Sequence, residues 1–64
     1  MTKYVVEFDR INQMIIEAED EEQAEQYATS FLGTRADIDK VERATDEDIS
    51  WTLAMGGMIH KVTV

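Results

Sequence analysis

The first part of the chain alternates apolar and polar residues with the two-residue period of a β-strand. Two segments, 3–9 and 13–18, show this pattern, and their alternating apolar residues are Tyr4, Val6, Phe8, Met14, Ile16 and Ala18. The three residues between them, 10–12, suit a hairpin loop in which Asn12 adopts a left-handed backbone conformation. That loop predicts an antiparallel hairpin that pairs Phe8 with Met14 and places all six apolar residues on one face.

A helix is expected over the residues that follow, between a cap at Asp20 and a terminator at Gly33. Asp20 is a common N-cap residue, and Gln23 is spaced as its capping-box partner. Apolar residues then recur at the spacing of one helix face, at Ala24, Tyr27, Ala28, Phe31 and Leu32. Gly33 is typical of the position just after a helix. We therefore expect this helix to pack across the sheet and to bury Phe31 in the same core as Phe8.

Two further strands are expected in the second half of the chain. Residues 38–44 contain only Ile38 and Val41 as large apolar residues, which suits a strand at the edge of the sheet. Residues 58–64 alternate apolar and polar side chains again and predict a closing strand.

The segment between those strands has two interpretations. A short helix is favoured, because Thr45 suits an N-cap, acids fill the first turn at 46–48 and the glycine at 56 can end it. The alternative is a strand over residues 49–55, where apolar residues also alternate, followed by a hairpin turn at Gly56-Gly57.

Together these elements predict a single α+β domain that spans residues 1–64. We expect a small, mostly antiparallel sheet with the element order β-β-α-β-α-β and the main helix packed on one face. In the alternative fold a β-hairpin at Gly56-Gly57 replaces the second helix.

The composition narrows the class of protein. Fourteen acidic residues against 6 basic ones give a formal net charge of −8, which repels nucleic acid and anionic membranes. The chain has no Cys, which excludes disulfides and Cys-based metal sites and suits a reducing cytoplasm. Neither a long apolar run nor a signal-peptide pattern is present, so no membrane association is expected.

No group of residues indicates catalysis or a cofactor. His60 is the single histidine, and no nucleophile or orienting acid can be assigned to it, so an ordinary place in the closing strand is the simpler interpretation. The acids lack the glycine-containing loop of a calcium site, and Gly56-Gly57 lacks the lysine and hydroxyl residues of a phosphate-binding loop. We therefore expect a protein that is not an enzyme and that holds neither a metal nor a cofactor.

The least ordinary feature of the sequence is a dense acidic segment. Six carboxylates and no base lie within residues 17–25. One interpretation is solvated charge that keeps the protein soluble. The other is a surface for a basic protein partner, carried by Glu17, Glu21, Glu22 and Glu25.

A second candidate interface is apolar. Trp51, Met55 and Met58 lie close together in the sequence, and Ile11 lies at the predicted hairpin tip. Such residues are usually buried, yet a domain with one main helix has little interior in which to bury them all. If they are exposed, they form a surface suited to protein binding.

Residues 4–28 resemble the strand–strand–helix opening of small DpnD/PcfM-like domains of mobile elements. The shared pattern is an apolar strand, the run Ile16-Glu17-Ala18, and acidic residues that lead to Ala24. The resemblance implies a phage or plasmid origin, where tiny acidic proteins often inhibit host enzymes or defence systems. It assigns no role to any residue, since these families have no established active site.

We accordingly expect a phage-type inhibitor that works in the host cytoplasm and occupies a basic groove of a host protein, without itself binding nucleic acid. One alternative is an oligomeric, sponge-like protein that sequesters a signalling nucleotide, for which the available cations are Lys3, Arg10, Arg35, Lys40, Arg43 and Lys61. The other alternative is a structural accessory module without inhibitory activity. A homo-oligomer is compatible with the sequence.

Overall fold

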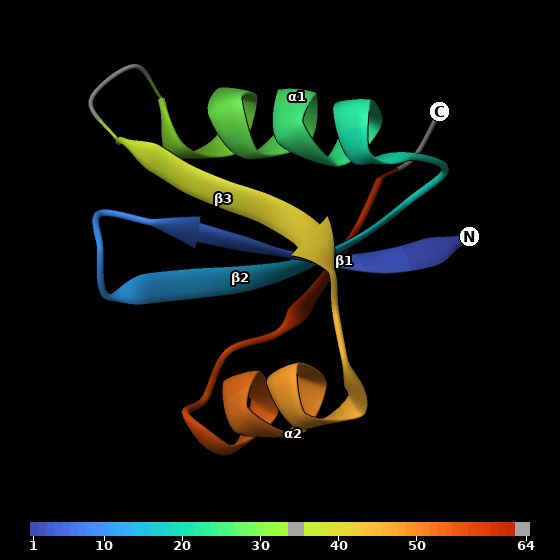
Figure 1. Ribbon diagram of the computed structural model, residues 1–64, viewed down its shortest axis with the longest axis vertical. Helices are drawn as coiled ribbons and strands as arrows, with labels where there is room; N and C mark the ends of the chain where they lie inside the picture. The colour runs from blue at the N-terminus through green and yellow to red at the C-terminus, as the bar shows by residue number, and fades with distance from the viewer. Residues whose placement is uncertain (34–35, 63–64) are drawn as a thin grey trace.

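Strands and helices follow one another in the order that the sequence predicts. The computed structural model describes residues 1–33 and 36–62. Its elements are β1 (Thr2–Phe8), β2 (Asn12–Ala18), α1 (Glu21–Leu32), β3 (Ile38–Arg43), α2 (Asp46–Ala54) and β4 (Ile59–Lys61) (Figure 1). The α+β class and the order β-β-α-β-α-β are therefore confirmed. The presence of α2 rules out the alternative hairpin at Gly56-Gly57.

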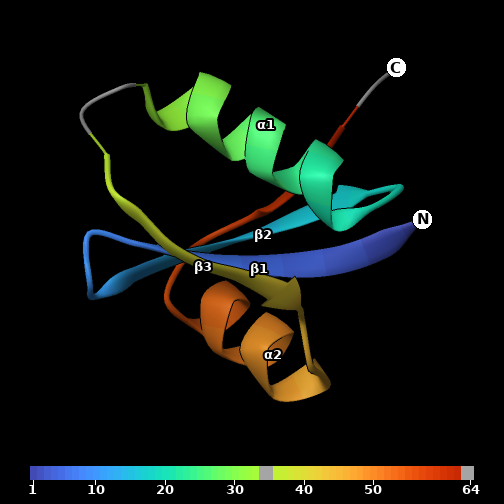
Figure 2. The ribbon, with the colours of Figure 1, turned by 45° about the horizontal axis from the view of Figure 1, so that its top comes forward.

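The sheet is mixed, with the strand order β3-β1-β2-β4. β1 pairs antiparallel with both of its neighbours, whereas β4 pairs parallel with β2. The strands β2, β3 and β4 consequently run in one direction, and each helix returns the chain between two of them. The crossover through α1 leads to the β3 edge of the sheet, and the crossover through α2 leads to the β4 edge. Because both crossovers have the same hand, the two helices lie on opposite faces of the sheet. Figures 1 and 2 show the resulting three layers, with the sheet between α1 and α2.

The hairpin between β1 and β2 differs from the prediction by two residues. Phe8 pairs with Asn12, so the predicted pairing of Phe8 with Met14 is wrong. Asp9 and Arg10, rather than Asn12, have the positive φ angles of the loop. Because a shift of two residues keeps every side chain on its own face, the predicted apolar face of the hairpin is nevertheless correct.

Contacts with the start of β3 explain this loop. The Asp9 N–H donates to the Asp37 carbonyl at 2.9 Å, and the Asp37 N–H donates back to the Asp9 carboxylate at 3.1 Å. The Arg10 N–H donates to the Asp39 carboxylate at 2.7 Å. These partners are 28 and 29 residues apart in the chain, so no local pattern predicts them.

The main core lies between the sheet and α1. Its buried residues are Tyr4, Val6, Met14, Ile16, Ala18, Ala24 and Ala28. Small residues in the middle of the helix face let α1 approach the sheet closely, and its larger side chains stand at the flanks. Phe8 is half-buried against this core, but Phe31 is 59% exposed. The prediction that Phe31 is buried in the core is therefore wrong.

A smaller core covers the other face of the sheet, beneath α2. Val5 and Ile15, which alternate with residues of the main core, are buried there. α2 contributes Thr52, its one buried residue, whose hydroxyl accepts a hydrogen bond from Gln13 Nε2 at 2.9 Å. The sequence predicts no position for this helix, and the structure places it over the second face of the hairpin.

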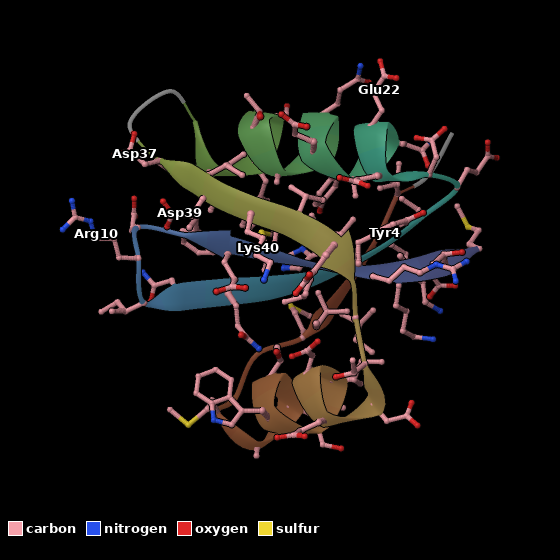
Figure 3. All side chains as sticks on the ribbon, in the orientation of Figure 1. Tyr4, Arg10, Glu22, Asp37, Asp39 and Lys40 are labelled. Atoms are coloured by element: carbon pink, nitrogen blue, oxygen red, sulfur yellow. The ribbon has the colours of Figure 1, made fainter. Side chains whose placement is uncertain are left out.

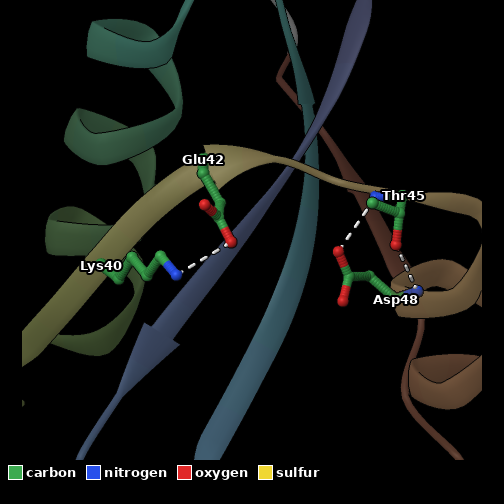
Figure 4. Close-up of polar contacts among 4 residues, drawn as sticks. All are labelled: Lys40, Glu42, Thr45 and Asp48. Carbon is green, nitrogen blue, oxygen red and sulfur yellow. Dashed lines mark hydrogen bonds and ion pairs between the residues drawn. The ribbon is translucent and has the colours of Figure 1, made fainter.

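Both helices begin at the predicted caps. The Asp20 carboxylate accepts a hydrogen bond from the Gln23 N–H at 2.8 Å, while the Gln23 side-chain oxygen accepts one from the Glu19 N–H rather than from the cap residue. At α2, Thr45 and Asp48 form a complete capping box (Figure 4). The two helices run in the same direction, so their capped first turns lie at the same end of the sheet (Figure 1).

β3 is an edge strand, as predicted, and it contains an irregularity. Glu7 pairs with Lys40, but the next residue of β1, Phe8, pairs with Ile38. This bulge lets Ile38 and Val41, which are three residues apart, both pack against the α1 core.

The closing strand is shorter than predicted. β4 spans Ile59–Lys61 and pairs with β2 from Ile15 onward. The end of the predicted strand, residues 63–64, lies outside the described residues. No helix in the described part of the chain is long and apolar enough to cross a membrane.

Candidate binding surface

The two ends of the sheet carry very different side chains. α1 and α2 both begin at one end, where their first turns carry the carboxylates of Glu21, Glu22, Asp46, Glu47 and Asp48. We call this the acidic end. Negative charge is favourable there because the N-terminus of a helix is partially positive. Both helices finish at the opposite end, near the β1–β2 hairpin, and neither has a basic residue in its last turn (Figure 1).

The four acidic residues predicted to bind a partner do not form one surface. Three of them lie exposed on α1, namely Glu21, Glu22 and Glu25. Figure 3 shows the Glu22 side chain pointing away from the sheet. Glu17 lies on β2 between two residues that face α1, so its side chain leaves the opposite face of the sheet. Its register neighbours are Lys3 on β1 and Lys61 on β4, whose charges oppose its own.

The outer surface of α1 holds a shallow hollow of about 460 Å³, lined by Glu22, Glu25, Gln26, Thr29 and Ser30. All of these residues belong to one helix, so the hollow is open to water. Within it, Gln26 Nε2 donates to Glu22 Oε1 at 3.5 Å. The surface offers negative charge and hydroxyl groups but no apolar anchor. It is therefore better suited to long-range attraction than to tight docking.

Large apolar side chains are exposed at the hairpin end of the sheet. They are Ile11 (84% exposed), Met55 (69%), Met58 (67%), Phe31 (59%) and Trp51 (51%). We call this group the apolar end. It draws on the hairpin loop, the last turn of α1, the end of α2 and the loop before β4. Exposed apolar groups gathered from several segments are typical of binding surfaces.

Two neighbouring hollows lie between these side chains. The first, of about 290 Å³, has a lining that includes Ile11, Trp51 and Met55. The second, of about 310 Å³, has a lining that includes Phe8, Phe31 and Met58. Gln13, Thr52 and Gly57 line both hollows and form their common wall. Each hollow can receive one apolar side chain of a partner.

A glycine pair shapes the common wall. The Gly57 N–H donates to the Thr52 carbonyl at 2.9 Å. A Cβ at position 57 would lie 2.8 Å from Thr52 Cγ2 and 3.0 Å from the Thr52 oxygen, too close for any other residue to fit without movement. Gly56 has a φ of +84°, which residues with a side chain rarely adopt. The pair ends α2, as predicted, and directs the chain past the hollows toward β4.

Phe31 is fixed by aromatic neighbours. Its ring centroid lies 4.8 Å from that of His60, at an interplanar angle of 63°, and 6.0 Å from that of Tyr27. The Tyr27 hydroxyl and His60 Nδ1 are 3.2 Å apart and hydrogen-bonded. An exposed ring held in this way has little conformational entropy left to lose on binding. The cluster therefore makes Phe31 a pre-organised anchor.

No group of three His, Cys, Asp or Glu residues in the described part of the chain is placed to hold a metal ion. The half-buried His60 contacts the aromatic rings of α1, in keeping with the structural role expected for it. Arg35 lies outside the described residues, and none of the three hollows is lined by a lysine or arginine.

One member of the apolar end was missed by the sequence analysis. Phe31 lies on the apolar stripe of α1, and that stripe alone predicts burial. The signal that distinguishes it is the small size of Ala24 and Ala28, which mark the centre of the buried face and leave Phe31 at its flank. There His60 of β4 contacts one side of the Phe31 ring, and 59% of the residue stays exposed.

Comparison with known proteins gives no match, whether the chain is compared with protein-family models, with curated proteins or with solved structures. The resemblance of residues 4–28 to DpnD/PcfM-like domains therefore stays a prediction.

Proposed function

We propose that the protein is a binding module that docks onto a basic protein partner through its apolar end. The observation that carries the proposal is the pair of adjacent hollows surrounded by large exposed apolar side chains. Keeping such surface in water is unfavourable, and a chain of 64 residues has little stability to offset that cost. A partner that covers the apolar end would remove this surface from water and so offset that cost.

The partner is expected to supply apolar anchors together with basic groups. Trp51 is of the residue type most enriched at binding hot spots, and the thioethers of Met55 and Met58 adapt to irregular surfaces. The last turns of α1 and α2 have no basic residue to interact with the negative ends of the helix dipoles. A lysine or arginine of the partner is favoured at these positions.

We assign the acidic end to attraction rather than to contact. A net charge of −8 attracts a basic protein over about a Debye length, roughly 8–10 Å at physiological salt. This attraction raises the association rate. After docking, the lifetime of the complex depends on the apolar contacts, which determine the dissociation rate.

Docking onto a basic surface makes the module an inhibitor when that surface is the partner's own functional groove. A groove that ordinarily holds nucleic acid is the expected case, because lysines and arginines line such grooves. The bound module would exclude nucleic acid by its volume and by its negative charge.

Selection from a display library of short random peptides tests the proposal before any natural partner is identified. The full chain serves as bait at physiological salt. We expect the selected peptides to combine aromatic or aliphatic residues with lysine or arginine. Trp51→Ser should weaken their binding by about tenfold or more, since it removes an apolar anchor from the lining of the first hollow.

Leu53→Ser provides the matched control. Leu53 lies on the same helix and is 51% exposed, as Trp51 is, but it lines neither hollow. Its replacement should leave peptide binding unchanged. Equal weakening by both substitutions would contradict the proposal, and so would selected peptides that contain basic residues alone.

A further inference from the structure

The outer edge of β3 is open to a second strand. β3 lies at one end of the strand order, and β1 is its one hydrogen-bonded neighbour among the described residues. Figure 1 views the molecule from this side, with β3 drawn in front of β1 and β2 and neither helix in front of it. Such an edge presents backbone N–H and C=O groups that can pair with another chain.

The hydrogen bonds to β1 determine which of these groups face outward. The Ala44 N–H donates to the Lys3 carbonyl at 2.9 Å. Bonding and non-bonding residues alternate along an antiparallel pair, so Glu42 and Lys40 also bond to β1, as far as the bulge at Ile38 and Asp39. Val41 and Arg43 therefore direct their N–H and C=O groups to the open edge.

The side chains of this edge carry a self-complementary charge pattern. Residues 39–43 read Asp-Lys-Val-Glu-Arg, which is negative, positive, neutral, negative, positive. Antiparallel pairing of this segment with a second copy, about a two-fold axis at Val41, places Asp39 opposite Arg43 and Lys40 opposite Glu42. Lys40 and Glu42 of each copy then face an opposite charge, which stabilises cross-strand pairs. Asp39 lies at the bulge, and its carboxylate already accepts a hydrogen bond from the Arg10 N–H.

Neighbouring registers are unfavourable. The outward backbone groups require odd-numbered residues to lie opposite one another, so the smallest allowed shift moves the axis from Val41 to Lys40 or to Glu42. The first shift places Lys40 opposite Lys40, and the second places Glu42 opposite Glu42. Like charges directly opposite each other are destabilising, so the charges select the register centred on Val41.

We infer that the protein forms a homodimer in which β3 pairs antiparallel with β3 of a second copy, centred on Val41, and the two sheets become continuous. This interface is independent of the proposed function, because β3 contributes no residue to the apolar end or to its hollows.

Lys40 and Glu42 already form an ion pair within one chain, and in the dimer each would exchange its partner for the same residue of the facing strand. In the single chain Lys40 Nζ lies 3.2 Å from Glu42 Oε1, and both side chains are about half exposed (Figure 4). The hydrogen bond to Glu42 and the charges of Glu42, Glu7 and Asp48 raise the pKa of the Lys40 amino group, so it is fully charged at neutral pH. In the dimer each Lys40 reaches the Glu42 of the facing strand across a non-hydrogen-bonded pair, where side chains come closest.

Long-range repulsion opposes this association, because each copy has a net charge of −8. Repulsion between whole molecules is screened beyond about 8 Å at 0.15 M salt but extends to about 30 Å at 0.01 M. The cross-strand pairs act at contact and are screened less. Self-association should therefore strengthen between low and physiological salt.

Two charge reversals and their mixture test the interface. Lys40→Glu turns both Lys40–Glu42 pairs of the dimer into like-charge pairs, and Glu42→Lys does the same with the opposite sign. Each variant alone should self-associate about tenfold more weakly than the wild type, or worse, in sedimentation equilibrium at physiological salt. An equimolar mixture of the two variants should form a heterodimer, because each reversed residue then faces an opposite charge.

Lys61→Glu on β4 and Glu22→Lys on α1 are the controls, since they change the net charge by the same amounts and should leave the dimer intact. Amide hydrogen exchange gives a second readout, with Val41 protected only in the dimer. A wild-type chain that stays monomeric up to about 1 mM, or a mixture that fails to restore the dimer, overturns the inference. Self-association that is lost in Trp51→Ser but unaffected by both β3 variants overturns it as well, and assigns the contact to the apolar end.

Discussion

The acidic end and the apolar end are both built from helix termini, but most of the acidic end interacts with its own helices, whereas most of the apolar end faces water. Asp20 caps α1, and Asp48 completes the capping box of α2. The remaining carboxylates of the first turns interact favourably with the helix dipoles. The side chains of the apolar end lie half or more in water, so much of their apolar surface is not buried within the chain. An unusual composition can thus have an internal cause, whereas for the exposed apolar surface we propose an external one, a protein partner.

The greatest loss of stability is expected in the core rather than at the apolar end. Ile16 is buried in the main core, so Ile16→Ala should cost about 2–5 kcal/mol, much of the stability of a domain this small. Phe31→Ala should cost no more than about 1.5 kcal/mol, because it removes only contacts with neighbouring rings. Urea denaturation of both variants gives the comparison. If Phe31→Ala is as destabilising as Ile16→Ala, Phe31 belongs to the core.

A smaller effect is expected from the wall between the two hollows. Gly57→Ala should destabilise the protein by about 1–3 kcal/mol, because the added Cβ would overlap Thr52. Gly33→Ala is the control, since its Cβ meets nothing within 4 Å and only its positive φ opposes the change. A loss of about 1–3 kcal/mol from backbone strain alone is expected there, because Gly33 combines a φ of 82° with a ψ of −179°. A Gly57→Ala variant as stable as the wild type would show that the wall does not depend on this close approach.

Acidic residues that cap a helix should contribute to the free energy of unfolding, whereas exposed acidic residues should contribute little. Asp20→Ala removes the cap of α1 and should cost about 1 kcal/mol. Glu25→Ala, on the exposed side of the same helix, should change the free energy of unfolding by less than about 0.5 kcal/mol. Thermal unfolding at physiological salt measures both. Equal costs would contradict the assignment of the first-turn acids to helix stability.

The smallest effect concerns the total charge. Glu21 and Glu25 are like charges one helical turn apart, and the chain as a whole carries −8. Their mutual repulsion weakens the folded state at low salt. The melting temperature should therefore rise by a few degrees between low and physiological salt. A flat or falling melting temperature would mean that the acids are compensated by bases or by a bound ion.

The elements of this fold could be predicted from the sequence because their signals are local. The caps at Asp20 and Thr45 and the apolar stripe of α1 lie within a few residues of the structure that they determine. The hairpin register could not be predicted, because the loop is fixed by Asp37 and Asp39, far along the chain. The face covered by α2 depends on the order of strands in the sheet, which no local pattern contains.

The candidate surface was predictable only in part. Trp51, Met55 and Met58 are close in the sequence and all exposed, but Phe31 joins them only because the topology brings the last turn of α1 to the same end. Glu17 was grouped with the helix acids because it is near them in sequence, yet strand alternation sends its side chain to the other face. Which surface residues lie together in space thus depends on the fold more strongly than which residues are buried in the core.

In the proposed complex the apolar end makes the contact, while the acidic residues provide attraction. The association and dissociation rates of a selected peptide, measured at several salt concentrations, separate these two roles. Trp51→Ser should raise the dissociation rate about tenfold or more and leave the association rate nearly unchanged. Reversal of Glu21, Glu22 and Glu25 to lysine should lower the association rate and its salt dependence, and leave the dissociation rate unchanged. If the triple reversal abolishes binding and Trp51→Ser has no effect, the acidic residues make the contact and this division of roles is wrong.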